Sequence, residues 1–197
     1  SQNLVVQILD VNDPPVWTIN TTSYSINEND SDVTIINIPV DVSDEDGDDI
    51  TFTPWSGDEV YSFKFNDNLL LFRNPPDYEE PDDRDNDNNY SVIVRAYDGS
   101  TGVDAPQFSI EVLPVNDNAP EFINLQMSVE VTNGQVDVLN VSTIDADGDD
   151  VSFSLSGEDS SVFKIDDSGL LSFKVSPDFS NPSDANADNV YIVNVEA

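Results

Sequence analysis

The strongest constraint on the fold is that the chain repeats itself once, with a period of about 100 residues. The stretch "VSDEDGDDITF" at 42–52 returns as "STIDADGDDVSF" at 142–153, and "PPDYEEPDD" at 75–83 returns as "SPDFSNPSD" at 176–184. Solenoid repeats are about 20–50 residues long, whereas a β-sandwich domain has about 100. We therefore expect two tandem domains joined by a short, Pro-containing linker.

Hydrophobic periodicity predicts that both domains are built from β-strands. Apolar residues alternate with polar ones, and clusters of Asp, Asn, Gly and Pro separate the runs. The expected strands are 3–9, 61–65, 90–98, 107–113, 162–165 and 191–197. No segment has a convincing helical period, so the fold class is all-β, with antiparallel sandwiches.

The composition limits the partners that the chain can have. It holds 40 acidic residues against 6 basic ones, for a net charge of −34, so repulsion opposes compaction unless counter-charge is bound. Nucleic acid is excluded as a partner because phosphate contacts need basic side chains. A hydrophobic content of 38% and 18 aromatic residues nevertheless favour a folded chain over a disordered one.

Two absent residue types narrow the chemistry further. The chain has no Cys and no His, which removes disulfides, thiolate metal sites and the commonest general base. It also lacks a Gly-rich phosphate loop and any nucleophile motif, so we expect no enzyme activity. No run of 18 apolar residues occurs, and the sequence predicts a soluble protein or a soluble piece of a longer one.

The repeated acidic turn, D-x-D-G-D-D, raises the question of which cation it holds. It resembles the start of an EF-hand loop, but the glutamate required at position 12 is replaced by Trp55 and Ser156, so an EF-hand is rejected. A single acidic turn is more often a solvated loop than an ion site. For the Asn-rich stretch "DDRDNDNNY" at 82–90 we favour an exposed, solvated loop over a ligand.

Five motifs, taken together, carry a resemblance to a known family. They are "NEN" at 27–29, "DYE" at 77–79, "AYD" at 96–98, "VNDN" at 115–118 and "DAD" at 145–147. The set resembles cadherin repeats over essentially all 197 residues, and the variants "DYEEP" and "DADGDD" are similar to the bacterial cadherin-like form.

This resemblance implies a fold and a set of domain boundaries. Each repeat is expected to be a seven-stranded Greek-key β-sandwich of immunoglobulin-like architecture. Residues 1–15 are expected to be the final strand and linker of a preceding repeat, and 16–113 one cadherin-like repeat. Residues 114–120 are then a calcium-binding linker, and 121–197 a second repeat without its final strand.

The resemblance also implies calcium ions at the inter-domain junctions, and the motifs supply only the oxygen ligands that Ca²⁺ prefers. For the internal junction, the ligands carried over from the family are Glu28, Asp77, Glu79, Asn116, Asp117, the Asn118 carbonyl, Asp145 and Asp147. For the junction before the first repeat, they are Asp10, Asn12, Asp13, Asp44, Asp46 and Asp98.

Three departures from the family pattern weaken parts of this set. The internal linker motif begins with Pro114, where the earlier one has Asp10. The last family ligand of the second repeat would fall two residues beyond Ala197. The second repeat also replaces the glutamates at its far end, so we expect weak or absent calcium binding there; its corresponding residues are Thr132, Asp178 and Ser180.

The implied function is a calcium-rigidified, rod-like adhesive segment of an extracellular or cell-surface protein, whose parent is membrane-associated. Its partners would be other cadherin-like repeats of the same or a neighbouring chain. Two alternatives stay open: a calcium-dependent carbohydrate-binding module that contacts polysaccharide, and a passive calcium-stiffened spacer. Trp17 and Trp55 could stack on sugars, but core or rim packing is the favoured role for both.

The terminal segments predict an exchange between copies. Residues 1–9 read as a spare strand, and the second repeat ends at "YIVNVEA" without a final strand. Adding the spare strand to the vacant edge of another copy would give head-to-tail oligomers. The favoured alternative is that residues 1–9 are simply disordered.

Overall fold

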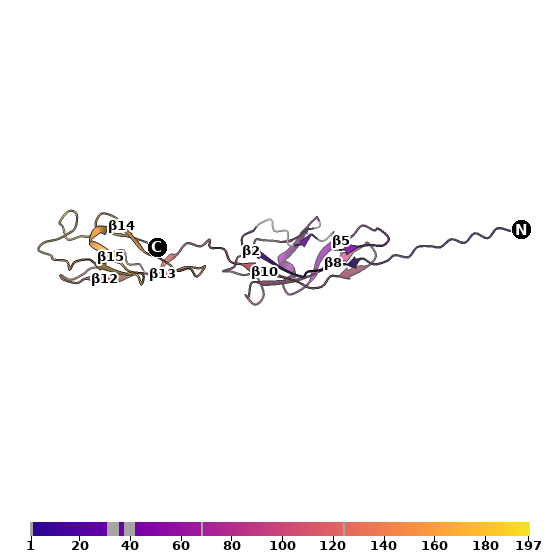
Figure 1. The fold of residues 1–197 in the computed structure, drawn as a ribbon, viewed down its shortest axis with the longest axis horizontal. Coiled ribbons are helices and arrows are strands. Elements are labelled where there is room, and N and C mark those ends of the chain that lie inside the picture. The colour runs from indigo at the N-terminus through magenta and orange to yellow at the C-terminus, as the bar shows by residue number, and fades with distance from the viewer. Residues whose placement is uncertain (1, 31–35, 38–41, 68, 124) are drawn as a thin grey trace. The chain divides into compact units, whose positions relative to one another are not determined.

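The chain forms two compact units, Ser1–Val115 and Asn116–Ala197, and each is described by itself (Figure 1). This computed structural model describes residues 2–30, 36–37, 42–67, 69–123 and 125–197. The boundaries expected for the repeats stay a prediction.

The first unit contains two larger sheets and one short strand pair. One sheet has the order β2-β10-β8-β5 with β9 beside β8, another has the order β3-β7-β6, and β1 pairs with β4. β10 runs parallel to β2 and antiparallel to β8. The strands are β1 (Val16–Trp17), β2 (Ser23–Asn27), β3 (Ile36–Asn37), β4 (Val42–Ser43), β5 (Thr51–Ser56), β6 (Phe63–Asn66), β7 (Leu69–Phe72), β8 (Asn89–Tyr97), β9 (Gly102–Asp104) and β10 (Phe108–Leu113).

Alternation along β8 and β10 explains how this unit buries its core. Every second side chain of these strands points to the same face, and those on one face are buried. The buried ones are Tyr90, Val92, Val94, Ala96, Phe108, Ile110 and Val112. All of them except Ala96 pack with side chains of β2, β6 and β7 into one core cluster, and the larger sheet is solvated on its other face.

The described strands of the second unit repeat part of this pattern, namely the pairs β1-β4 and β5-β8 and the sheet β3-β7-β6. Its sheets are β11-β13, β12-β16-β15 and β14-β17. The strands are β11 (Glu121–Ile123), β12 (Asp137–Asn140), β13 (Ser142–Ile144), β14 (Ser154–Ser156), β15 (Phe163–Ile165), β16 (Leu170–Phe173) and β17 (Asn194–Glu196). Its main core cluster has three buried residues, Phe163, Leu171 and Phe173, with partly buried residues packed around them.

The internal repeat extends to individual side-chain contacts. In the first unit Phe72 packs edge-on against Tyr90, with ring centroids 4.9 Å apart. In the second unit Phe173 packs edge-on against Tyr191 at 5.0 Å. The hydroxyl of each tyrosine accepts a hydrogen bond of 3.1 Å from a backbone N–H eight residues earlier in the chain. The same residues therefore anchor the same loop in both units.

The all-β fold class is confirmed. The helical elements in the described ranges are two single 3₁₀ turns, η2 (Val60–Ser62) and η3 (Ser160–Val162). The strand expected at 3–9 is wrong, because no sheet edge pairs with this segment in the described structure and its side chains are exposed. An alternating sequence forms a strand only where partner backbone groups are available.

The two tryptophans take packing positions at the rim of the first unit. Trp17 lies against Phe52 with ring centroids 5.9 Å apart, and its Nε1–H donates to the Val103 carbonyl at 3.0 Å. Trp55 is half exposed, and the guanidinium of Arg95 lies 3.6 Å from the ring centroid. Arg95 therefore covers one face of the Trp55 indole.

Candidate metal centres

The acidic turn after β4 folds its carboxylates together in the first unit. Asp44 Oδ1 accepts hydrogen bonds from the N–H groups of Asp46 at 3.0 Å and Asp48 at 3.3 Å. The N–H of Asp13 donates to Asp46 Oδ2 at 2.6 Å. One carboxylate oxygen from each of Asp44, Asp46 and Asp48 lies within 4.8 Å of the others. The turn thus gathers three negative charges in one small volume.

A second contact ties the chain before β1 to the end of β8. Asn12 Nδ2 donates to Asp98 Oδ2 at 3.0 Å. Asp98 is buried, and its Oδ1 accepts from the N–H groups of Ser100 at 2.7 Å and Thr101 at 2.6 Å. The Thr101 N–H and the Asn12 amide hold the pKa of the Asp98 carboxyl below its usual value. Asp10 is exposed, and its Oδ1 accepts only a local bond, from Val11 N–H at 3.1 Å, among those described.

The electrostatics of this turn favour a bound cation. Burial, followed by the charges of Asp44, Asp46 and Asp98, raises the pKa of the Asp48 carboxyl. Asp44 Oδ2 is a buried oxygen without a hydrogen-bond partner in the described structure. A buried carboxylate oxygen that lacks a donor is costly unless a metal ion or water approaches it.

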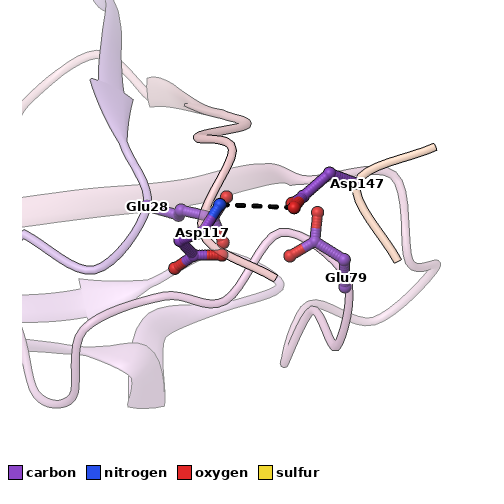
Figure 2. A group of neighbouring side chains, drawn as sticks. All are labelled: Glu28, Glu79, Asp117 and Asp147. Atoms are coloured by element: carbon purple, nitrogen blue, oxygen red, sulfur yellow. Dashed lines mark hydrogen bonds between the residues drawn. The ribbon is translucent and has the colours of Figure 1, made fainter. Parts of the chain in front are cut away.

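The other end of the first unit is organised by Glu28, which follows β2. This carboxylate is 2% exposed, and it accepts the N–H of Tyr78 at Oε2 and the N–H of Val115 at Oε1, both at 2.7 Å. A carboxylate oxygen of Glu79 lies within 4.8 Å of one from Glu28 (Figure 2). Asp77 is exposed and turns its Oδ1 to the Glu79 N–H at 3.1 Å.

The first residues of the second unit are hydrogen-bonded to its own acidic turn. Asp147 Oδ2 accepts the N–H of Asp117 at 3.2 Å, the dashed line in Figure 2, and the N–H of Asn118 at 2.8 Å. The Asn118 side-chain amide also donates to Asp117 Oδ1 at 2.8 Å. Asn116 Nδ2 donates to Asp149, whose own N–H donates to Asp145 Oδ1 at 3.2 Å.

Within each unit, most of the metal ligands expected from the sequence are hydrogen-bonded to another expected ligand or have a carboxylate oxygen within 4.8 Å of one. Reasoning from the family motifs missed Asp48 and Asp149, although both stand in the repeated D-x-D-G-D pattern, which offered the signal. It also treated 82–90 as a solvated loop, which is wrong for Asp83 and Asn88. Both are buried, and carboxylate oxygens of Asp83, Asp85 and Asp87 lie within 4.8 Å of one another.

All of these groups offer the same ligand chemistry. They present carboxylate, amide and backbone oxygens, with no nitrogen or sulfur ligand, because the chain has no His and no Cys. Such ligands suit a hard divalent cation with a flexible coordination number, and Ca²⁺ accepts six to eight of them. The acid clusters are therefore candidate calcium ligands.

Comparison with known proteins identifies the fold. No protein-family model matches the chain. The extracellular fragment EC1-2 of human protocadherin-24 matches 94% of this chain over 95% of its own length, at 21% identity and a TM-score of 0.67. Drosophila N-cadherin EC1-4 matches 93% of this chain over 45% of its own length, at 21% identity and a TM-score of 0.71. The fold is cadherin-like.

A curated sequence agrees with the structural matches. Human protocadherin Fat 4 is 30% identical over 141 residues, which are 67% of this chain. The chain spans only 3% of that protein's length. The resemblance to cadherin repeats is therefore confirmed, whereas the likeness to the bacterial form stays a prediction.

The cadherin-like match leaves the finer expectations as predictions. They include calcium binding, the adhesive partner, and the expectation that the chain has no enzyme activity. A cis-dimer structure of protocadherin gammaB7 EC3-6 also matches, at 20% identity and a TM-score of 0.58, over 85% of this chain and 44% of that one.

Within the described ranges, no helix has the length and hydropathy needed to cross a bilayer.

Proposed function

We propose that this chain is a calcium-stiffened, adhesive segment of an extracellular protein, with Ca²⁺ bound where its two units join. The ligands are those of the internal junction set, from Glu28 through Asp147. The cadherin fold supports an extracellular, adhesion-type role, and the acid clusters of the two units support the ion.

The observation that carries the proposal is how each half of the junction is tied to the linker. Glu28 of the first unit holds the N–H of Val115, and Asp147 of the second holds the N–H of Asp117. Only Asn116 stands between these two residues, and two residues of extended chain span at most about 7 Å. The linker therefore keeps Glu28 and Asp147 within about 13 Å of each other for any orientation of the units.

Repulsion between the carboxylates that each unit contributes to the junction explains why an ion would alter the junction. Two unit charges 4.8 Å apart, the limit for Glu28 with Glu79 and for Asp117 with Asp147, repel by about 1 kcal/mol in water. At the effective dielectric constant of 20 found near protein surfaces, the repulsion is about 3 kcal/mol. Bringing both halves together without a cation adds further repulsion, so the ion-free joint should open and bend.

Calcium reverses this balance because it is attracted to both halves at once. Its affinity should be on the order of 10⁻⁵ to 10⁻³ M, the range of weak sensors and extracellular modules. At a concentration 100 times the Kd, binding to the folded state alone would stabilise it by about 2.7 kcal/mol. The replacement of an Asp by Pro114 predicts fewer ions than a family junction normally holds.

The stiffening is tested by small-angle scattering of the full chain in calcium and in chelator. We expect a longer maximum dimension in calcium. Glu79→Ser should remove this change and lower the calcium stoichiometry, because a bridging carboxylate serves two ions. Glu111→Gln, on the solvent-exposed face of β10, is the charge-matched control. Identical scattering with and without calcium would contradict the stiffening, and unchanged stoichiometry in Glu79→Ser would show that the ligand assignment is wrong.

Adhesion is tested separately, since a stiff segment can also be a passive spacer. Beads coated with the chain should aggregate in calcium and disperse in chelator. Calcium-dependent scattering without aggregation would favour the spacer. Retention on insoluble polysaccharide would favour the carbohydrate-binding alternative, which the comparisons do not support and which Arg95 disfavours at the Trp55 face.

The opposite end of the second unit should bind calcium poorly. Asn133 and Ser180 stand where the first unit has Glu28 and Glu79, because the Phe179 N–H donates to Asn133 Oδ1 at 2.7 Å as the Tyr78 N–H does to Glu28 Oε2. The expected residue Thr132 is therefore wrong by one position. The Ser180 N–H donates to Asp178 Oδ1 at 2.9 Å. Neither residue supplies a carboxylate, so Asp178 is the one acid that remains of this set.

A further inference from the structure

Both units carry a second acidic loop, made of residues outside the proposed junction ligand set and ending just before Tyr90 in the first unit and Tyr191 in the second. Its sequence is "DRDNDN" at 83–88 and "DANADN" at 184–189. Oxygen-bearing side chains occupy positions 1, 3 and 5 of each loop. The fourth and sixth residues have positive φ in both, with values of 59–62° in the first loop and 61–64° in the second. The two loops therefore have the same backbone turn.

In the first unit the loop wraps around Asp83. This residue is 6% exposed, and its carboxylate accepts N–H groups from Asn86, from Asp87 at 3.2 Å and from Asn88 at 2.6 Å. The side chains at positions 1, 3 and 5 present carboxylate oxygens that all lie within 4.8 Å of one another. Three negative charges so close together repel each other unless a cation lies between them.

In the second unit the corresponding carboxylate has an oxygen with no donor. Asp184 is 8% exposed, and its Oδ2 accepts the Asp188 N–H at 2.7 Å. Its Oδ1 is buried without a hydrogen-bond partner. Asn186 Nδ2 donates to Asp188 Oδ2 at 3.0 Å, so the side chains at positions 3 and 5 are in contact. A carboxylate oxygen that is buried with no donor is costly, and a cation bound in the loop would satisfy it.

The buried oxygens that lack a partner are not scattered over the molecule. In the part of the chain that the structure describes there are three of them, on Asp44, Asn88 and Asp184. Asn88 and Asp184 belong to the two loops, at positions 6 and 1. The first loop, with three carboxylates, and the second loop, with two, thus each contain a buried oxygen without a hydrogen-bond partner.

We propose that each of these loops binds one calcium ion inside its own unit, separately from the junction. The side chains of Asp83, Asp85 and Asp87 bind the first ion, and those of Asp184, Asn186 and Asp188 bind the second. Ligands at alternate positions 1, 3 and 5, followed by a backbone carbonyl at position 7, are the arrangement by which a tight loop surrounds Ca²⁺. Water completes each coordination shell.

The affinity of these sites should be low. Position 12, where an EF-hand has a bidentate glutamate, is Val94 in the first loop and Val195 in the second. With few charged ligands and water in the shell, we expect dissociation constants on the order of 10⁻⁴ to 10⁻³ M. The first loop has three carboxylates and the second has two, so the first should bind more tightly. Mg²⁺ should bind less well than Ca²⁺, because it demands near-ideal octahedral geometry and loses water reluctantly.

The ion would fasten the loop to the core. The hydroxyl of Tyr90 accepts the N–H of Asp82, the residue before the first loop, and Tyr191 accepts the N–H of Ser183 before the second. Each loop is thus attached to its aromatic core on one side, and calcium would fix its other side. We therefore expect calcium to stabilise each unit by itself.

The test is a calcium titration of the full chain, in which the backbone amide NMR signals of the loops and of the junction are monitored. Amides at 86–88 and 187–189 should shift with saturation curves of their own. Asp85→Asn should weaken binding at the first loop about tenfold, since it removes a charged ligand but no described hydrogen bond. Asn186→Asp should strengthen binding at the second loop about tenfold. Glu158→Gln, an exposed acid outside the loops, is the control for net charge.

The effect of Asn186→Asp on the stability of the second unit distinguishes an ion site from a purely structural loop, because an ion site predicts opposite effects in chelator and in calcium. Asn186→Asp loses the amide donor to Asp188 and adds repulsion, so it should destabilise the second unit in chelator. In excess calcium it should stabilise that unit, because the new carboxylate binds the ion. Destabilisation in both conditions would overturn the proposal, as would loop amides that stay fixed while calcium saturates. Shifts at Asp147 report the junction independently, so failure of one kind of site is distinguishable from failure of the other.

Discussion

Replacing Glu28 by glutamine tests whether this buried carboxylate organises the end of the first unit. Its two oxygens each accept a backbone N–H at 2.7 Å, from Tyr78 and from Val115. Glutamine has the same shape, but one of its two terminal atoms is an NH₂ group. That group faces a backbone N–H at hydrogen-bonding distance, so one bond is replaced by a donor-donor contact.

The expected cost follows from these two bonds. A hydrogen bond to a charged group contributes about 1.5–3 kcal/mol, and leaving its buried N–H unsatisfied costs a similar amount. The remaining bond weakens because its acceptor is no longer ionised. Glu28→Gln should therefore lower the free energy of unfolding of the first unit by about 2–4 kcal/mol in the absence of calcium. For a domain of this size, that corresponds to a fall in Tm of roughly 10–20 °C.

Tryptophan fluorescence isolates the unit concerned. Both tryptophans of the chain, Trp17 and Trp55, lie in the first unit, so their signal during urea unfolding reports that unit alone. Glu111→Gln is the matched control, because Glu111 is exposed and makes a single described side-chain bond of 3.3 Å, from Ser25 Oγ. It should cost less than about 0.5 kcal/mol.

Calcium gives the experiment a second arm. If Glu28 also binds the junction ion, the wild-type protein gains about 2.7 kcal/mol at 100 times the Kd, and the variant gains less. The difference between them should then widen in calcium. A Glu28→Gln variant no less stable than Glu111→Gln would refute the structural argument. A difference that is the same in calcium and in chelator would refute the ligand role alone.

Two further predictions concern the second unit. Gly169→Ala should destabilise it by more than about 3 kcal/mol and leave the tryptophan transition unchanged, since the residue has φ of +83° and an added Cβ would overlap the Val141 carbonyl oxygen. Gly134→Ala is the control in circular-dichroism melts, because its φ is +84° but its nearest contact is 3.8 Å, so about 1 kcal/mol of backbone strain is expected. The hydroxyl of Ser168 is the main cause that lowers the pKa of Asp166, so this carboxylate stabilises the unit above pH 3.8, and the effect is lost as the pH falls through its folded-state pKa. Ser168→Ala should move that pKa back toward 3.8 in an NMR titration, and an unchanged value would contradict the assignment.

Much of the fold could be predicted from the sequence because period-2 patterns and an internal repeat are local signals. The strands expected at 90–98 and 107–113 became β8 and β10 almost residue for residue. The same signal failed at 3–9, where the alternation is equally regular. Strand formation there depends on a partner strand, which is a property of the whole fold and not of the segment.

The candidate sites were predictable to a smaller extent. The acid turns and the glutamates could be read from their motifs, because Ca²⁺ requires a particular ligand type. Burial of Asp83 could not be read in the same way, since a run of Asp and Asn has the composition of a solvated loop. Its burial results from backbone N–H groups that fold back onto the carboxylate, and this requires the positive φ angles of Asn86 and Asn88. Single-residue polarity does not encode that geometry.

The buried carboxylate oxygens of this chain therefore have two kinds of environment. The buried acids Glu28, Asp83 and Asp98 of the first unit accept backbone N–H groups, and these bonds are present without any ion. Asp44 and Asp184 have a buried oxygen that accepts nothing. The bonds from backbone N–H groups set the shape of the loops, and a cation would complete the oxygens that lack a donor. Calcium should accordingly order and stiffen an already folded protein, so chelation should leave the far-ultraviolet circular dichroism nearly unchanged while it lowers Tm and shortens the chain in solution. Loss of the β-sheet signal on chelation would show that the ions, and not the backbone N–H groups, hold the loops together.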